Sequence, residues 1–155
     1  MCANTNTTKE FIISEALKHF DEGYACSQSV LLAFADHFKL DKTMAKRISS
    51  TFGGGMGRLR ETCGAVIGGF MVLGLAFGNE EPKDMDTKLN SYTKVRELNK
   101  LVEDIHGTTN CRQLLIKHAT EAEVQDRKHH KIICRKVVGD ATALVYDILK
   151  ENNEI

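Results

Sequence analysis

Residues 53–69 read Gly53-Gly54-Gly55-Met56-Gly57-Arg58-Leu59-Arg60-Glu61-Thr62-Cys63-Gly64-Ala65-Val66-Ile67-Gly68-Gly69. The first half is a glycine-rich, basic loop, and the second half is an apolar segment interrupted by glycines, which predicts a turn leading into a buried helix. Cys63 stands where the loop becomes the helix. The helix N-terminus and the guanidinium groups of Arg58 and Arg60 favour a thiolate, so we expect the pKa of Cys63 to lie below the usual value of about 8.5. Because thiolates attack disulfides and bind metals, this run predicts a redox or metal site.

Apolar residues recur at helical spacing on both sides of this run, and no stretch alternates with a period of two for long enough to predict a strand. Helices are expected at about 9–22, 25–38, 42–52, 63–77, 86–105 and 127–150, with a short helix beginning near 111. The expected N-caps are Thr7 or Thr8, Asp41, Thr62, and Thr109 or Asn110. The sequence thus predicts an all-α, single-domain bundle of six or seven helices over residues 9–152, with a flexible N-terminus at 1–8 and a glycine-rich loop before the central helix.

Two predicted helices carry further information. The central one contains four glycines, each costing roughly 1 kcal/mol relative to alanine, which indicates close backbone approach to neighbouring helices or to a ligand; they are Gly64, Gly68, Gly69 and Gly74. The helix at 86–105 is amphipathic, and its expected inward residues share one apolar stripe; they are Leu89, Tyr92, Val95, Leu98, Val102 and Ile105.

The composition excludes several classes of function. Lys+Arg and Asp+Glu are balanced at 21 each, so nothing favours nucleic acid or an anionic membrane as a partner. The longest apolar stretch, 65–77, is about 13 residues long, whereas a membrane span needs about 20, so membrane insertion is not expected. The N-terminus has no signal-peptide pattern, which predicts a cytoplasmic location, where thiols stay reduced.

Four of the five cysteines share one property: each lies on the apolar face of a predicted helix, near the beginning of that helix. They are Cys26, Cys63, Cys111 and Cys134, whereas Cys2 lies in the N-terminus. Inward side chains of different helices can converge in a bundle core, as cofactor ligands do. A single buried cysteine is more often a small hydrophobe, and no Cys-x-x-Cys pair is present, unlike the commonest zinc and ferredoxin-type sites.

These residues resemble a known family of redox-active proteins named for a C_GCAxxG_C_C pattern. The Cys-Gly-Ala-x-x-Gly motif reads Cys63-Gly64-Ala65-Val66-Ile67-Gly68, the preceding residues 53–58 are similar to the glycine loop of the family, and the other three family cysteines correspond to Cys26, Cys111 and Cys134. The resemblance spans about residues 10–150 and implies a redox or cluster-binding role in a small helical domain. A similar module accompanies certain multihaem cytochromes, but this chain has no Cys-x-x-Cys-His, so no covalent haem is expected.

Three interpretations follow. In the first, Cys63 is the attacking thiolate in thiol–disulfide or peroxide-type chemistry, and Cys26 or Cys111 resolves the product, which makes the protein a possible thiol-dependent oxidoreductase. In the second, the four family cysteines hold an iron–sulfur cluster or zinc. In the third, the domain is a non-catalytic interaction module with incidental cysteines.

The residues expected to act at the site, besides those cysteines, are Gly54, Gly55, Arg58 and Gly64. The expected partner is a redox protein or a small-molecule substrate, and a homodimer is a further prediction.

Overall fold

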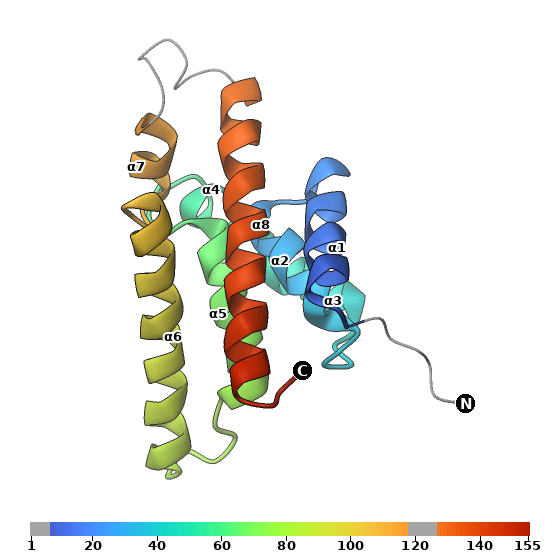
Figure 1. The fold of residues 1–155 in the computed structure, drawn as a ribbon, viewed down its shortest axis with the longest axis vertical. Helices are drawn as coiled ribbons and strands as arrows, with labels where there is room; N and C mark the ends of the chain where they lie inside the picture. The colour runs from blue at the N-terminus through green and yellow to red at the C-terminus, as the bar shows by residue number, and fades with distance from the viewer. Residues whose placement is uncertain (1–6, 118–126) are drawn as a thin grey trace, which may run out of the picture.

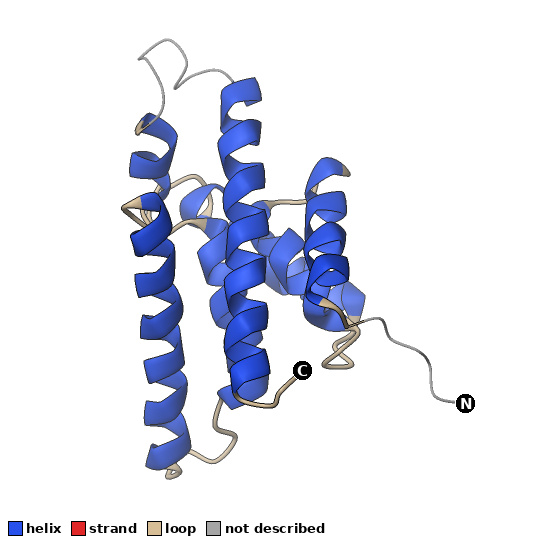
Figure 2. Cartoon of the chain, in the orientation of Figure 1, coloured by secondary structure: helices blue, strands red, loops and turns tan. Residues whose placement is uncertain are grey.

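The computed structural model describes residues 7–117 and 127–155. Their regular structure is helical, with one isolated bridge, between Thr62 and Asn110, and no strand (Figure 2). The helices are α1 (Lys9–Asp21), α2 (Cys26–Ala35), α3 (Lys42–Ser50), α4 (Gly53–Met56), α5 (Gly64–Phe77), α6 (Met85–His106), α7 (Cys111–Ile116) and α8 (Arg127–Glu151). The predicted all-α class is confirmed.

The glycine loop contains α4, a single turn in which Gly54 and Gly55 have left-handed backbone angles. When the single turn α4 is not counted, the described residues form seven helices, in agreement with the predicted six or seven. Cys2 and residues 120–126, between the predicted short helix and the last helix, lie outside the described residues.

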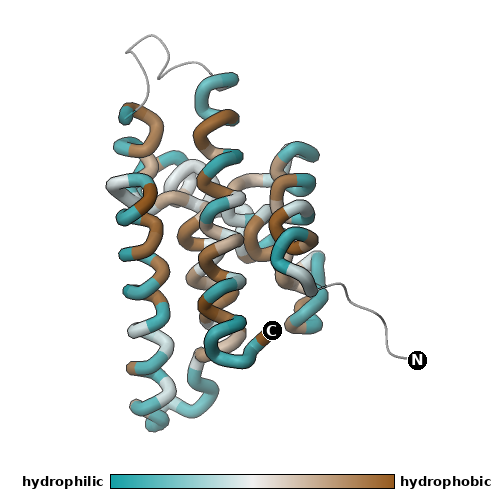
Figure 3. The backbone as a smooth tube through the Cα atoms, in the orientation of Figure 1, coloured by the Kyte–Doolittle hydropathy of each residue, from teal (hydrophilic) through white to brown (hydrophobic). Residues whose placement is uncertain are grey.

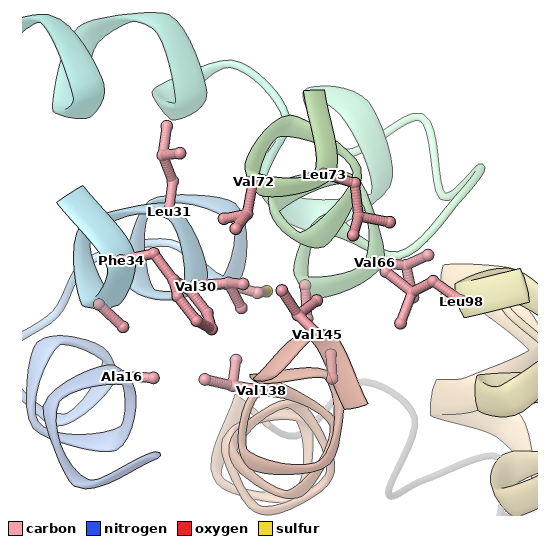
Figure 4. Close-up of a cluster of buried hydrophobic side chains, with 14 of the residues drawn as sticks. Ala16, Val30, Leu31, Phe34, Val66, Val72, Leu73, Leu98, Val138 and Val145 are labelled. Atoms are coloured by element: carbon pink, nitrogen blue, oxygen red, sulfur yellow. The ribbon is translucent and has the colours of Figure 1, made fainter. Parts of the chain in front are cut away.

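The long helix α8 is the centre of the bundle and contacts α1, α2, α5 and α6 (Figure 1). Figure 3 shows hydrophobic and hydrophilic residues alternating along α6 and α8, as expected for helices with one buried side. Figure 4 shows the core between α2, α5 and α8, where Phe34, Val72 and Val145 are fully buried. Burying a side chain of this size contributes roughly 1.5–3 kcal/mol.

Most helix starts follow the expected capping chemistry. Thr8, Asp41 and Asn110 accept a hydrogen bond from a backbone N–H in the first turn of α1, α3 and α7. The expectation for the central helix was wrong by one residue, because Cys63 occupies the N-cap position of α5. Thr62 is extended instead, since it forms the bridge with Asn110.

The predicted inward stripe of α6 was wrong in part. Leu98 and Val102 are buried, but Leu89, Tyr92 and Ile105 are 54%, 49% and 53% exposed. Leu89 precedes Leu98 by nine residues, and at about 3.6 residues per turn this places them on opposite sides of the helix. The expected stripe advanced by three residues at each step from Leu89 to Leu98, so its first members drifted around the helix. Ile105 lies on the side of Leu98 but is exposed in the last turn of α6.

Two glycines allow α5 to lie directly on α2. A Cβ at Gly68 would be 2.7 Å from the carbonyl oxygen of Ser27, and a Cβ at Gly64 would be 2.9 Å from that of Phe52 and 3.4 Å from the Ser27 nitrogen. Gly64 and Gly68 are one helical turn apart, so both face the same side of α5. This contact explains the spacing of glycines in Cys-Gly-Ala-x-x-Gly and places the start of α5 beside the start of α2.

None of the described helices combines the length and the apolar character needed to cross a membrane.

We expect Gly68→Ala to destabilise the protein by about 1–3 kcal/mol, because the new methyl group would push α5 away from the α2 backbone. The matched control is Gly74→Ala, at a position in the same helix where an added Cβ meets nothing within 4 Å. That substitution is expected to leave stability unchanged or raise it by up to about 1 kcal/mol. Chemical denaturation of both variants measures the difference, and equal effects would contradict this account of the helix contact.

Candidate functional site

The four family cysteines line one small cavity. Cys26 begins α2, Cys63 is the N-cap of α5, Cys111 begins α7, and Cys134 lies in the second turn of α8. The first three are buried, Cys134 is half-buried, and all four are free thiols. The remaining wall consists of Gly54, Gly64, Arg60, Leu114, Leu115, Ile133 and Val137. The free volume is about 30 Å³, enough for a water molecule or two.

The bridge between Thr62 and Asn110 brings Cys63 and Cys111 to this cavity. The Cys63 N–H donates to the Thr109 carbonyl at 2.8 Å, and the Cys111 N–H donates to the Glu61 carbonyl at 2.6 Å. Each cysteine follows a bridged residue, so the two side chains extend from the same face of this two-stranded contact. The backbone therefore ties together two thiols that are 48 positions apart in sequence.

The glycine loop lies against the thiols because its backbone adopts conformations that suit glycine. Gly54 and Gly55 have φ of 69° and 71°. A Cβ at Gly55 would lie 2.5 Å from the Cβ of Cys111, so this glycine makes room for Cys111. The Gly54 N–H points to the Cys26 sulfur and favours its thiolate form. Successive backbone N–H groups in left-handed turns form concavities that suit anions, including those of iron–sulfur sites.

Cys26 is the thiol that ionises most readily. The Cys134 thiol donates to its sulfur, and with further help from the N–H groups of Gly54 and Cys26 and the charge of Arg60, this outweighs burial and lowers the pKa of Cys26 to about 7. The same donation, together with burial, raises the pKa of Cys134. Cys26 and Cys134 therefore form a thiolate–thiol pair at neutral pH.

The expected low pKa of Cys63 was wrong. Burial and the nearby charge of Cys26 raise the pKa of Cys63 to about 12, although the N–H groups of Ala65 and Val66 oppose this shift. The side chain makes no capping hydrogen bond to α5. The N–H groups at the start of α5 do stabilise a thiolate here. The loss of hydration on burial destabilises the thiolate by more, so the net effect is a raised pKa. Burial also raises the pKa of Cys111, against the opposing effect of Arg60 and Arg112.

The two arginines of the loop have different places. Arg60 lines the cavity, and its Nη1 donates to the Cys111 sulfur at 3.7 Å. Arg58 is exposed and is not among the cavity-lining residues; its Cγ lies 2.9 Å from the position that a Gly54 Cβ would take. Of the predicted glycines, Gly54 and Gly64 line the cavity, and Gly55 supports it from behind Cys111.

The apolar wall was not predicted, although the sequence contains its signal. Leu114 and Leu115 follow Cys111 by three and four residues, and Val137 follows Cys134 by three. Residues at these spacings share a helix face, so they accompany the cysteines into the same cavity.

The geometry does not suit a single metal ion. Among the described residues, no three His, Cys, Asp or Glu side chains are arranged to hold one. Four sulfurs around one zinc ion lie about 2.3 Å from it, and hence only about 3.8 Å from one another. The thiols line a common space without this tight arrangement.

A protein-family model describes this combination of cysteines and glycines. Its description is "Putative redox-active protein (C_GCAxxG_C_C)", and it matches residues 24–148. The chain belongs to this family. The match includes all four cavity cysteines and supports a redox role for the C_GCAxxG_C_C domain. No curated protein and no solved structure matches the chain.

In the reduced, metal-free protein, the first thiolate should appear at a pH of about 7 and belong to Cys26. Thiolate absorption during a pH titration measures this step, which Cys26→Ser should remove and Cys2→Ser should leave unchanged. Between pH 7 and the ordinary value of 9.0 the unfolded chain holds more protons at this residue, so ionisation of Cys26 should add stability as the pH rises. A first step that disappears in Cys63→Ser and persists in Cys26→Ser would contradict this assignment.

Proposed function

We propose that this C_GCAxxG_C_C protein is an electron carrier whose Cys26, Cys63, Cys111 and Cys134 thiolates together hold an iron–sulfur cluster. The observation that carries the proposal is the shared cavity: four thiols from four separate parts of the chain line one small, largely apolar space. A chance group of buried cysteines has no reason to converge in this way. The redox description of the family agrees with such a role.

The donor set favours a cluster over zinc. Four cysteine thiolates are the usual ligands of two-iron and four-iron clusters, and a cluster spreads its ligands over more than one metal atom. The four thiols converge on one cavity, as cluster ligation requires, but its free volume of about 30 Å³ is smaller than a cluster, so the thiols would move apart when a cluster binds. When bound, such a cluster would supply reversible one-electron redox chemistry.

The residues around the thiols prepare the site for negative charge. Arg60 supplies a positive charge beside Cys111, and the Gly54 N–H points to Cys26. Leu114, Leu115 and Val137 are buried and make part of the cavity wall apolar. Because the pKa values of Cys63, Cys111 and Cys134 are raised, metal binding must displace their protons, so loading should weaken at acidic pH.

A second candidate is a dithiol redox centre formed by Cys26 and Cys134, supported by their thiolate–thiol pairing. The Cys26 thiolate would attack a disulfide, releasing a thiolate, or would take one oxygen from a hydroperoxide to become a sulfenic acid, releasing an alkoxide that solvent protonates to the alcohol. Cys134 would then attack the mixed disulfide or sulfenic acid, and its proton would leave with the departing thiolate or hydroxide. The two thiols lose two electrons in total, and the oxidant gains two. This assignment replaces Cys63 by Cys26 as the attacking residue, because Cys63 is buried with a raised pKa.

The deciding experiment is anaerobic purification of the full chain from iron-replete cells, followed by assay of iron, acid-labile sulfide and visible absorption. We expect a coloured protein with both elements bound. Serine at each of Cys26, Cys63, Cys111 and Cys134 should lower bound iron at least about tenfold or change the spectrum, because a thiolate ligand is lost. Cys2→Ser is the matched control and should keep full occupancy.

Colourless protein with four reduced thiols, even after anaerobic reconstitution with iron and sulfide, would refute the cluster. Mild oxidation of that protein would then test the second candidate, which requires a Cys26–Cys134 disulfide in peptide mapping. Cluster loss in none of the four serine variants would show that the cavity is not the binding site.

A further inference from the structure

Basic side chains surround the outer side of the cysteine cavity. Arg60 donates to the Cys111 sulfur at 3.7 Å, and Arg112 follows Cys111 in the first turn of α7. Arg58 packs over Gly54, which lines the same cavity. Arg58 and Arg112 are exposed, and neither forms an ion pair within the described part of the chain. Unpaired arginines on one face are available to a partner.

The two segments that carry these arginines, the glycine loop and α7, also expose apolar side chains. Leu59, between the two loop arginines, is 69% exposed, and Ile116 on α7 is 48% exposed. The loop and α7 are joined by the hydrogen bond from the Cys111 N–H to the Glu61 carbonyl. Apolar residues beside arginines and charged rim groups are a composition typical of protein–protein interfaces.

The backbone of this loop holds two arginines in an unfavourable conformation. Arg58 and Arg60 have φ of 65° and 61°, in the left-handed region where a Cβ is crowded and glycine is the usual residue. The Arg60 side chain donates a hydrogen bond to the Cys111 sulfur. In the described part of the chain, the Arg58 side chain forms no hydrogen bond that would offset the strain of its backbone. Strained residues of this kind cluster at functional sites.

The opposite end of the long axis carries an acidic loop. The loop between α5 and α6 exposes Glu80, Glu81 and Asp84 beside a single basic residue, Lys83. Figure 1 shows this loop at one end of α6 and α7 near the other end. Among the described residues, this acidic loop is therefore far from the loop that carries Arg58 and Arg60, although Glu61 is also exposed in that second loop. Such a distribution orients an approaching charged partner.

We propose that the basic face, defined by Arg58, Leu59, Arg60, Arg112 and Ile116, docks an acidic electron-transfer protein beside the cysteine cavity. The proposal rests on the redox function above and names the partner class for that site. Carboxylates of the partner would pair with the arginines, and Leu59 and Ile116 would pack in the centre of the contact. Redox partners form small, transient interfaces, for which charge complementarity governs association more than buried area does.

The test is binding of the full chain to a fluorescently labelled acidic flavodoxin, followed by anisotropy at low and at physiological ionic strength. A basic c-type cytochrome is the probe of opposite charge. We expect the flavodoxin to bind at low salt, to bind more weakly as salt rises, and to bind more tightly than the cytochrome. Arg58→Glu and Arg112→Glu should each weaken binding about tenfold. Lys83→Glu, the same charge change at the acidic end, should change it less than about twofold.

The variant Arg58→Gly distinguishes loss of charge from loss of stability, because glycine adopts the left-handed conformation without strain. It should weaken flavodoxin binding while leaving the thermal midpoint unchanged or higher. The proposal would be overturned if Arg58→Glu and Lys83→Glu weakened binding equally, or if Arg58→Gly kept full affinity. It would also be overturned if the cytochrome bound more tightly than the flavodoxin, or if the flavodoxin did not bind at low salt. The measurement needs no bound cluster, so a protein that binds flavodoxin but holds no iron would refute the cluster alone.

Discussion

The site depends on how closely α5 approaches α2. Gly64 and Gly68 present no side chain to the backbone at Ser27, so the two helices meet there almost backbone to backbone. The starts of both helices then lie side by side, and each start carries a cysteine, Cys26 on α2 and Cys63 before α5. A methyl group in this contact would separate the two sulfurs as well as the helices. The glycines that allow the close helix contact therefore also bring Cys26 and Cys63 together.

Burial makes the four thiols depend on one another. In water each would ionise at its ordinary pKa, but in a largely apolar cavity the first negative charge disfavours the next. Cys26 takes that first charge, because the Cys134 thiol and the Gly54 N–H stabilise it, and the other three thiols keep their protons. The four thiols therefore do not act as independent nucleophiles, because three of them stay protonated. Such a set is suited to a cationic cofactor that replaces several protons together, or to a pair that shares one proton and exchanges two electrons.

The glycine loop contributes on both of its sides. Inward, Gly55 makes room for Cys111 and Gly54 offers an N–H to Cys26. Outward, the loop exposes Arg58 and Leu59 next to α7. One segment thus lines the cysteine cavity on its inner side and, on its outer side, carries part of the surface that we propose as a docking site. This arrangement is consistent with the redox description of the C_GCAxxG_C_C family.

Local chemistry in the sequence determined the helices, most of their caps and the group of four cysteines. Helical periodicity, capping side chains and glycine breaks act within a few residues, so they can be read without a structure. Tertiary structure decided the rest. The protonation state of Cys63 depends on the burial of its sulfur in the packed protein. The exposure of Leu89 depends on which side of α6 packs against α5 and α8. Cys63 and Cys111 lie side by side because of the backbone bridge between Thr62 and Asn110, which are 48 positions apart in sequence. Burial, charge coupling and long-range backbone pairing are properties of the packed chain, and no local pattern contains them.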